Sequence, residues 1–170
     1  MELRAHIRDV PDFPKPGIVF KDITPMLGDA KALAHVVERM AAPYHGKGIT
    51  KVVGIESRGF IFATPIALAL GAGFVPIRKP GKLPWKSRSQ KYGLEYGTDT
   101  IEIHDDAVSS KDLVLLVDDV LATGGTMEAA CKLVRLLGGN IVGCAFAIDL
   151  AFLGGAKRLD APCFSVLSYA

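Results

Sequence analysis

Paired carboxylates followed by a glycine turn form the most informative pattern in this sequence. Asp118 and Asp119 follow the apolar run Val114–Val117, and Ala122-Thr123-Gly124-Gly125-Thr126 precedes a helical pattern. Paired carboxylates can accept hydrogen bonds from a vicinal diol. Glycines let the backbone approach an anion closely, while threonine hydroxyls and the free N–H groups of a helix start donate to it. The pattern predicts a ribose and phosphate site; the alternative is a turn that the two acids merely cap.

The two acids need a strand that ends where they begin. From residue 51 onward, short apolar runs rich in β-branched residues alternate with helical patterns, which predicts an α/β fold with a mainly parallel sheet flanked by helices. The expected strands are Val52–Ile55, Phe74–Ile77, Leu113–Val117 and Ile141–Ile148. In such sheets ligands bind beyond the carboxyl ends of the strands, which is where Asp118 and Asp119 emerge.

Three helices are expected between these strands and before them. The first begins after Asp29, which serves as its N-cap, and stops before Pro43. The second covers the apolar stretch Phe60–Leu70. The third carries apolar residues at helical spacing from Met127 to Leu137 and ends at the glycine pair 138–139.

Two segments interrupt the α/β pattern. Residues 11–25 contain too many prolines for a regular element, which predicts a small irregular lobe. Residues 79–96 combine prolines with an excess of lysine and arginine and have no sustained apolar period. A loop of that length is typical of a lid or binding element. Leu94–Ile103 alternates weakly, like an edge strand or hairpin.

Composition restricts the classes of function. The chain has 170 residues, 49% of them hydrophobic, and we expect a single domain over residues 1–170. Its 20 basic and 18 acidic residues leave a net charge of +2, with no basic arm or acidic tail that would predict a nucleic-acid or membrane partner. The first ten residues form no apolar signal core, so we expect a cytoplasmic location. Cys131, Cys144 and Cys163 lack metal-ligand spacing, and we interpret them as buried thiols.

The motif at 117–126 resembles the phosphoribosyl-pyrophosphate motif of the type I phosphoribosyltransferase family. Four further motifs extend the resemblance to the adenine-specific branch of that family over nearly the whole chain: residues 13–23 (FPKPGIVFKDI), 54–60 (GIESRGF), 78–84 (RKPGKLP) and 94–97 (LEYG). The resemblance implies transfer of the 5-phosphoribosyl group from 5-phosphoribosyl-1-pyrophosphate (PRPP) to adenine, giving AMP and pyrophosphate. The implied fold has a small N-terminal hood at residues 1–28 and a mobile lid loop at 79–96.

The resemblance also assigns the ribose and phosphate contacts. Asp118 and Asp119 would hold the ribose 2′- and 3′-hydroxyls, and the loop of Ala122, Thr123, Gly124, Gly125 and Thr126 would hold the 5′-phosphate. Arg58 could bind the pyrophosphate bidentately; the alternative is a surface ion pair between Glu56 and Arg58. A cis peptide between Glu56 and Ser57 is implied as well. The other basic residues assigned to substrate binding are Arg78, Lys79 and Lys82.

The purine site is assigned in the same way. Glu95 matches the glutamate that the family places over the base, where it exchanges a proton with the purine; the alternative is an exposed strand residue. Its neighbour Tyr96 is assigned to substrate binding. In the hood, the backbone of Val19 would read the adenine edge, Phe20 would stack on the ring, and Lys21 would lie nearby.

A metal ion and a second subunit complete the expectations. Mg²⁺ is implied by the pyrophosphate and would be bound mainly through PRPP, with few or no protein ligands; none of the four histidines has metal-ligand spacing. A homodimer is expected, in which Arg78 reaches the partner's pyrophosphate site. Two alternatives stay open: an enzyme for xanthine or hypoxanthine and guanine, and a PRPP-binding regulator without catalysis.

Overall fold

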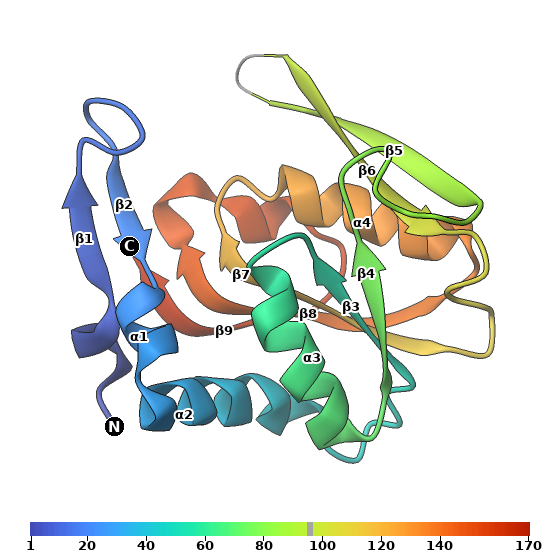
Figure 1. Ribbon diagram of the computed structural model, residues 1–170, viewed down its shortest axis with the longest axis horizontal. Coiled ribbons are helices and arrows are strands. Elements are labelled where there is room, and N and C mark those ends of the chain that lie inside the picture. The colour runs from blue at the N-terminus through green and yellow to red at the C-terminus, as the bar shows by residue number, and fades with distance from the viewer. Residues whose placement is uncertain (95–96) are drawn as a thin grey trace.

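A parallel sheet forms the centre of the computed structural model, which describes residues 1–94 and 97–170 (Figure 1). Its strand order is β4-β3-β7-β8-β9. The strands are β3 (Lys51–Ile55), β4 (Gly73–Ile77), β7 (Leu113–Leu121), β8 (Asn140–Leu150) and β9 (Cys163–Tyr169). Every apolar run predicted as a strand lies in this sheet, so the mainly parallel α/β fold is confirmed. β7 extends beyond its predicted end, and its additional residues include both adjacent acids.

Helices cover both faces of the sheet. α2 (Ala30–Ala41) and α3 (Gly59–Leu70) pack on one face, and α4 (Gly125–Leu136) packs on the other (Figure 1). The Asp29 side chain accepts hydrogen bonds from the N–H groups of Lys31 and Ala32, which confirms it as the N-cap of α2. Short 3₁₀ helices lie at Leu3–His6, Ala42–Tyr44, Ala151–Leu153 and Gly155–Arg158.

The N-terminal segment is more regular than its prolines predict. β1 (Arg8–Pro11) pairs antiparallel with β2 (Val19–Asp22), and α1 (Thr24–Gly28) follows. The expectation of an irregular lobe over residues 11–25 is therefore wrong for β2 and the start of α1, whereas residues 12–18, which connect β1 to β2, are irregular. The prolines fall where they disturb no backbone hydrogen bond of a strand interior or helix: at the end of β1, in the β1–β2 connection and in the first turn of α1.

The predicted loop at 79–96 is also partly a strand. β5 (Ser87–Gly93) pairs antiparallel with β6 (Thr98–His104) to form a hairpin beside α4 (Figure 1). Because β5 is polar and mostly exposed, its sequence has no apolar alternation to identify it. The apolar face of the hairpin comes from β6, where Ile101 and Ile103 are buried. β6 confirms, from Thr98 onward, the edge strand or hairpin expected over Leu94–Ile103.

The cysteines differ in exposure. Cys131 and Cys144 are buried, with their sulfur atoms 3.7 Å apart, whereas Cys163 is exposed near the start of β9. The interpretation of all three as buried thiols is wrong for Cys163, because an edge strand is covered on one side only. In the described parts of the chain, every helix is too short or too polar to cross a bilayer.

Candidate active site

A pocket of about 540 Å³ lies at the carboxyl ends of the central strands, between the hood and the hairpin. Ten of the residues assigned from the sequence line it: Val19, Phe20, Lys21, Arg58, Arg78, Lys79, Asp118, Asp119, Ala122 and Thr126. Thr123, Gly124 and Gly125 line a smaller adjoining hollow of about 70 Å³ together with Ala122 and Thr126. The Lys82 ammonium contacts Glu56, which lines the pocket. Glu95 and Tyr96 lie outside the described residues.

The two acids at the end of β7 have different surroundings. Asp119 is 5% exposed, and its Oδ2 lies 2.6 Å from Nε of Arg58. Burial, and next the adjacent charge of Asp119, raise the pKa of Asp118 well above its usual range. The arrangement therefore favours one neutral carboxyl group beside one carboxylate that is held by a guanidinium.

The loop after these acids leads directly into α4. Gly124 has a φ of +88°, which non-glycine residues rarely adopt, and a Cβ there would lie 2.6 Å from the carbonyl oxygen of Gly155. Residue 124 is therefore glycine for two reasons, its backbone conformation and its close neighbour. The free N–H groups of the first turn of α4, at the positive end of the helix dipole, adjoin the hollow.

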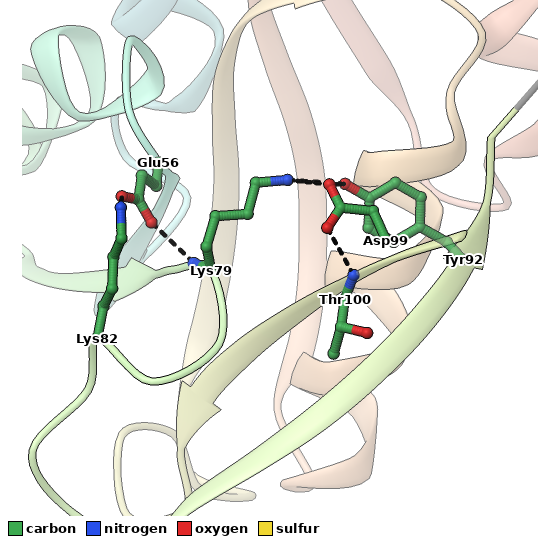
Figure 2. A network of polar contacts seen from close by, with 6 residues as sticks. All are labelled: Glu56, Lys79, Lys82, Tyr92, Asp99 and Thr100. Carbon is green, nitrogen blue, oxygen red and sulfur yellow. Dashed lines mark hydrogen bonds and ion pairs between the residues drawn. The ribbon is translucent and has the colours of Figure 1, made fainter. Parts of the chain in front are cut away.

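Glu56 binds three basic residues that follow β4: Arg78, Lys79 and Lys82. Its carboxylate accepts hydrogen bonds from the Lys79 backbone N–H (2.7 Å) and the Lys82 Nζ (2.5 Å) (Figure 2). It also accepts one from an Arg78 Nη (3.2 Å). Burial opposes the ionised form, but these three donors outweigh it and lower the pKa of Glu56 to about 2. The alternative of a Glu56–Arg58 ion pair is wrong, because Arg58 turns to Asp119 instead.

A second network connects Lys79 to the hairpin of β5 and β6. The Lys79 ammonium is paired with Asp99 on β6, and the Tyr92 hydroxyl on β5 donates to the same carboxylate (Figure 2). Burial alone would lower the pKa of Lys79, and the hydrogen bonds to Asp99 and Tyr92 raise it. Lys79 is thus held on two sides: its backbone N–H by Glu56, which follows β3, and its ammonium by Asp99 on β6.

The hood contributes an aromatic wall. The centroid of the Phe20 ring lies 5.5 Å from the Arg58 guanidinium carbon. The rings of Phe13 and Phe20 pack edge to face, with their centroids 5.2 Å apart. Val19 is 51% exposed beside Phe20. Lys21 also lines the pocket, but its ammonium lies 2.7 Å from Asp9 and 4.3 Å from the ring of Tyr169, so the hood is attached to the last strand.

Several pocket residues were not identified from the sequence. Tyr92, Ile101 and Leu150 line the pocket, and Asp99 holds Lys79. Leu150 ends the buried strand β8, so the strand-end argument that placed Asp118 could have found it. Tyr92 and Asp99 carry no such signal, because they enter the site only through the pairing of β5 with β6.

The backbone at the pyrophosphate side agrees with the family pattern. The peptide between Glu56 and Ser57 is cis, as the resemblance implies. Throughout residues 1–94 and 97–170, no group of three or more histidine, cysteine, aspartate and glutamate side chains is placed to hold a metal ion.

Comparisons with known proteins agree with this geometry. Residues 24–169 match the family model of the phosphoribosyl transferase domain. Adenine phosphoribosyltransferase from Myxococcus xanthus is 59% identical over 93% of this chain and 86% of its own length. The crystal structure of adenine phosphoribosyltransferase from Rhodothermus marinus is 55% identical, covers 98% of this chain and 96% of that one, and has a TM-score of 0.93.

A more distant relative carries ligands. The crystal structure of adenine phosphoribosyltransferase from Saccharomyces cerevisiae, complexed with an imino-altritol bisphosphate and adenine, is 40% identical over 98% of this chain and 97% of that one, with a TM-score of 0.90. The acids at the end of β7, the glycine loop before α4 and the near-complete coverage of these relatives lead to one conclusion: this chain belongs to the adenine phosphoribosyltransferase family of type I phosphoribosyltransferases.

Proposed function

We propose that this protein transfers the 5-phosphoribosyl group from PRPP to adenine and releases pyrophosphate. The observation that carries the proposal is the juxtaposition of Asp118 and Asp119, the 122–126 loop and Phe20 of the hood around one pocket and the hollow that adjoins it. These groups match in order the ribose, the 5′-phosphate and a flat aromatic base. The adenine in the yeast relative's crystal structure supports the choice of base.

The acids fit the charge that develops at the ribose. As the bond from C1 to pyrophosphate breaks, the sugar ring gains positive charge, which a nearby carboxylate stabilises. Asp119, held by Arg58, would supply that charge, while the carboxyl group of Asp118 would share the ribose hydroxyls. We further propose that Val19 contributes its backbone to the base edge, because a fixed N–H and C=O pair discriminates adenine from hypoxanthine.

The pyrophosphate would compete with Glu56 for cations. Arg78 and Lys82 are both bound to that carboxylate, and a pKa of about 2 keeps it ionised at neutral pH. A diphosphate carries more charge than a carboxylate and would attract Lys82 more strongly, whereas Arg78 would leave Glu56 for the diphosphate in the neighbouring subunit's site, as proposed below. Arg58 and Lys79 are the neighbouring candidates for the remaining phosphate oxygens.

Mg²⁺ suits this site as a partner of the substrate. The ion prefers oxygen ligands and usually binds through one or two carboxylates together with substrate phosphates. Asp118 and Asp119 line the pocket together with Glu56, and the carboxyl group of Asp118 and the carboxylate of Asp119 would orient the ion's water ligands. When bound, the ion would neutralise the leaving pyrophosphate.

The function is tested by pyrophosphate release with PRPP, Mg²⁺ and a panel of adenine, hypoxanthine, guanine and xanthine. We expect release with adenine only, and release about a thousandfold slower from the Asp119→Asn protein prepared in the same way. Release with another purine would establish one alternative enzyme. PRPP binding without release from any purine would establish the regulator.

Glu95→Gln is expected to lower kcat about a hundredfold, with a much smaller rise in KM for adenine. The amide keeps the size of the side chain and most of its hydrogen bonding but cannot exchange a proton with the base. Steady-state kinetics over a range of adenine concentrations distinguishes the roles. A change confined to KM would make Glu95 a binding residue.

Closure of the lid segment can be followed through Trp85, the only tryptophan in the sequence. Trp85 is 62% exposed. In the chain it lies between Lys82, which contacts Glu56, and the start of β5. We expect its emission to shift to shorter wavelength when PRPP and Mg²⁺ are added together, because closure would remove the indole from water. An unchanged spectrum at saturating PRPP would contradict closure over the ligand.

We also propose that the active unit is a homodimer in which Arg78 serves the neighbouring site. Arg78 directly follows β4, the edge strand of the sheet, and the α3 surface next to it exposes Ile61 and Leu68, by 40% and 79%. In a two-fold dimer each site would then combine one chain's Asp119 with the other chain's Arg78.

Mixing Arg78→Ala chains with Asp119→Asn chains, under conditions of subunit exchange, is expected to restore about a quarter of wild-type activity. Random pairing makes about half of the dimers mixed, and each mixed dimer has one intact site of two. Each variant protein must be inactive when it is assayed alone, and native mass spectrometry verifies that the subunits exchange. If Arg78 acted within its own chain, every site would keep one lesion and no activity would return.

A further inference from the structure

A turn that sequence analysis did not single out lies directly behind the phosphate loop. Residues Gly155–Arg158 form a short 3₁₀ helix between β8 and β9. A Cβ at Gly155 would lie 2.4 Å from the carbonyl oxygen of Ala122 and 3.0 Å from the N of Gly124. Backbone therefore packs on backbone, and the position of this turn is fixed relative to the loop that we assign to the 5′-phosphate.

Arg158, at the end of this turn, extends along the loop toward the helix start. Its Nε lies 3.3 Å from Oε2 of Glu128 in the first turn of α4. Its Nη1 is the closest atom to a Cβ built at Gly125, at 3.5 Å. The ion pair with Glu128 thus engages Nε of the guanidinium, and Nη1 lies next to the loop backbone at Gly125.

The same guanidinium lines an open hollow between the hairpin and the loop. The residues around this hollow are Tyr92, Gly93, Leu94, Thr123, Gly125, Thr126 and Arg158. Among them only Arg158 carries a charge, and its side chain is 44% exposed. Hydroxyl and backbone N–H donors are neutral, whereas a phosphate monoester at neutral pH carries close to two negative charges. The loop alone offers no full positive charge to it.

We propose that Arg158 is a ligand of the 5′-phosphate and that Glu128 orients it. The proposal rests on the proposed function, because it specifies which end of PRPP and AMP the arginine binds: the phosphate monoester, and not the diphosphate. The guanidinium donates to a phosphate oxygen from the side of the hairpin, while the N–H groups at the start of α4 donate from below.

The test compares Arg158→Gln with Lys157→Gln, a matched loss of one positive charge at the neighbouring exposed position. Kd is measured by calorimetry for ribose 5-phosphate and AMP, which carry the monoester, and for pyrophosphate, which does not. We expect Arg158→Gln to weaken the two monoesters about tenfold and to leave pyrophosphate unchanged. Lys157→Gln should leave all three unchanged, and Arg158→Lys should restore part of the monoester affinity.

Two outcomes would overturn the proposal. One is unchanged monoester binding by Arg158→Gln; the other is an equal loss for pyrophosphate, which would indicate a distorted pocket. The proposed function fails separately. Wild-type protein that binds ribose 5-phosphate but releases no pyrophosphate from PRPP would disprove the transferase activity, and the contribution of Arg158 would still be measured by the same titrations.

Discussion

Asp119→Asn is expected to lower kcat about a thousandfold while the protein stays folded. The amide keeps the shape of the side chain but removes the negative charge that would face the ribose as positive charge develops on it. It also removes the partner of Arg58, whose Nε lies 2.6 Å from the carboxylate. Because the Arg58 side chain is half exposed, we expect its loss of pairing to cost little stability. Steady-state kinetics and thermal unfolding followed by circular dichroism provide the two measurements.

Asp118→Asn is the matched control. Burial and the neighbouring carboxylate already favour the neutral form of Asp118, so a neutral amide changes the charge of the site less. We expect its kcat to fall about tenfold, far less than that of Asp119→Asn. Equal losses in the two variants would mean that the negative charge is shared between the acids and would contradict its assignment to Asp119.

Gly124→Ala is expected to lower kcat/KM for PRPP about a thousandfold. The new Cβ would lie 2.6 Å from the carbonyl oxygen of Gly155, and neither backbone segment can move without displacing the loop. A displacement of about 1 Å at a substrate-positioning loop costs on the order of a hundredfold in rate, and weakened phosphate hydrogen bonds add to that loss. PRPP titration and initial-rate kinetics measure the two parts.

Gly138→Ala separates this effect from the cost of an unfavourable φ. Gly138 has a φ of +89°, against +88° at Gly124, and lies at the opposite end of α4. A Cβ there would come no closer than 3.5 Å to its neighbours. Alanine in this conformation costs about 1–2 kcal/mol of stability at either position. We expect Gly138→Ala to be less stable but fully active; a comparable loss of activity in both variants would show that stability alone explains the Gly124 result.

Periodic patterns and strand-end chemistry carried most of the prediction. The buried strands β3, β7 and β8 appear in the sequence as apolar runs because they are covered on both faces. The start of α2 was predicted from its N-cap residue, Asp29. Since ligands bind where parallel strands end, locating β7 in the sequence was enough to place Asp118 and Asp119 in a pocket.

Elements that are polar or depend on distant partners could not be found in this way. β5 has no apolar alternation, and its pairing with β6 brings Tyr92 and Asp99 to Lys79. Arg158 lies far in sequence from the 122–126 loop that it borders. Only the glycines at 124 and 155, where the two backbones meet, mark this contact in the sequence. Glu95 and the shared use of Arg78 stay predictions from the family resemblance.

The order of the strands also sets the entropy of assembling the site. The pairs β3–β4 and β7–β8 close loops from Lys51 to Gly73 and from Val114 to Ile141, whereas Leu113 of β7 bonds to Thr50, 63 residues away, just before β3. This loop is more than twice as long as either of the others, and each doubling of length adds about 0.6 kcal/mol of closure entropy. Arg58 follows β3 and Asp119 lies in β7, so their ion pair spans the joint between two locally connected halves of the chain. The binding site is thus formed by the pairing of β3 with β7, whose loop closure costs the most entropy of these pairings. We expect a chain with only its local strand pairings in place to bind neither PRPP nor adenine.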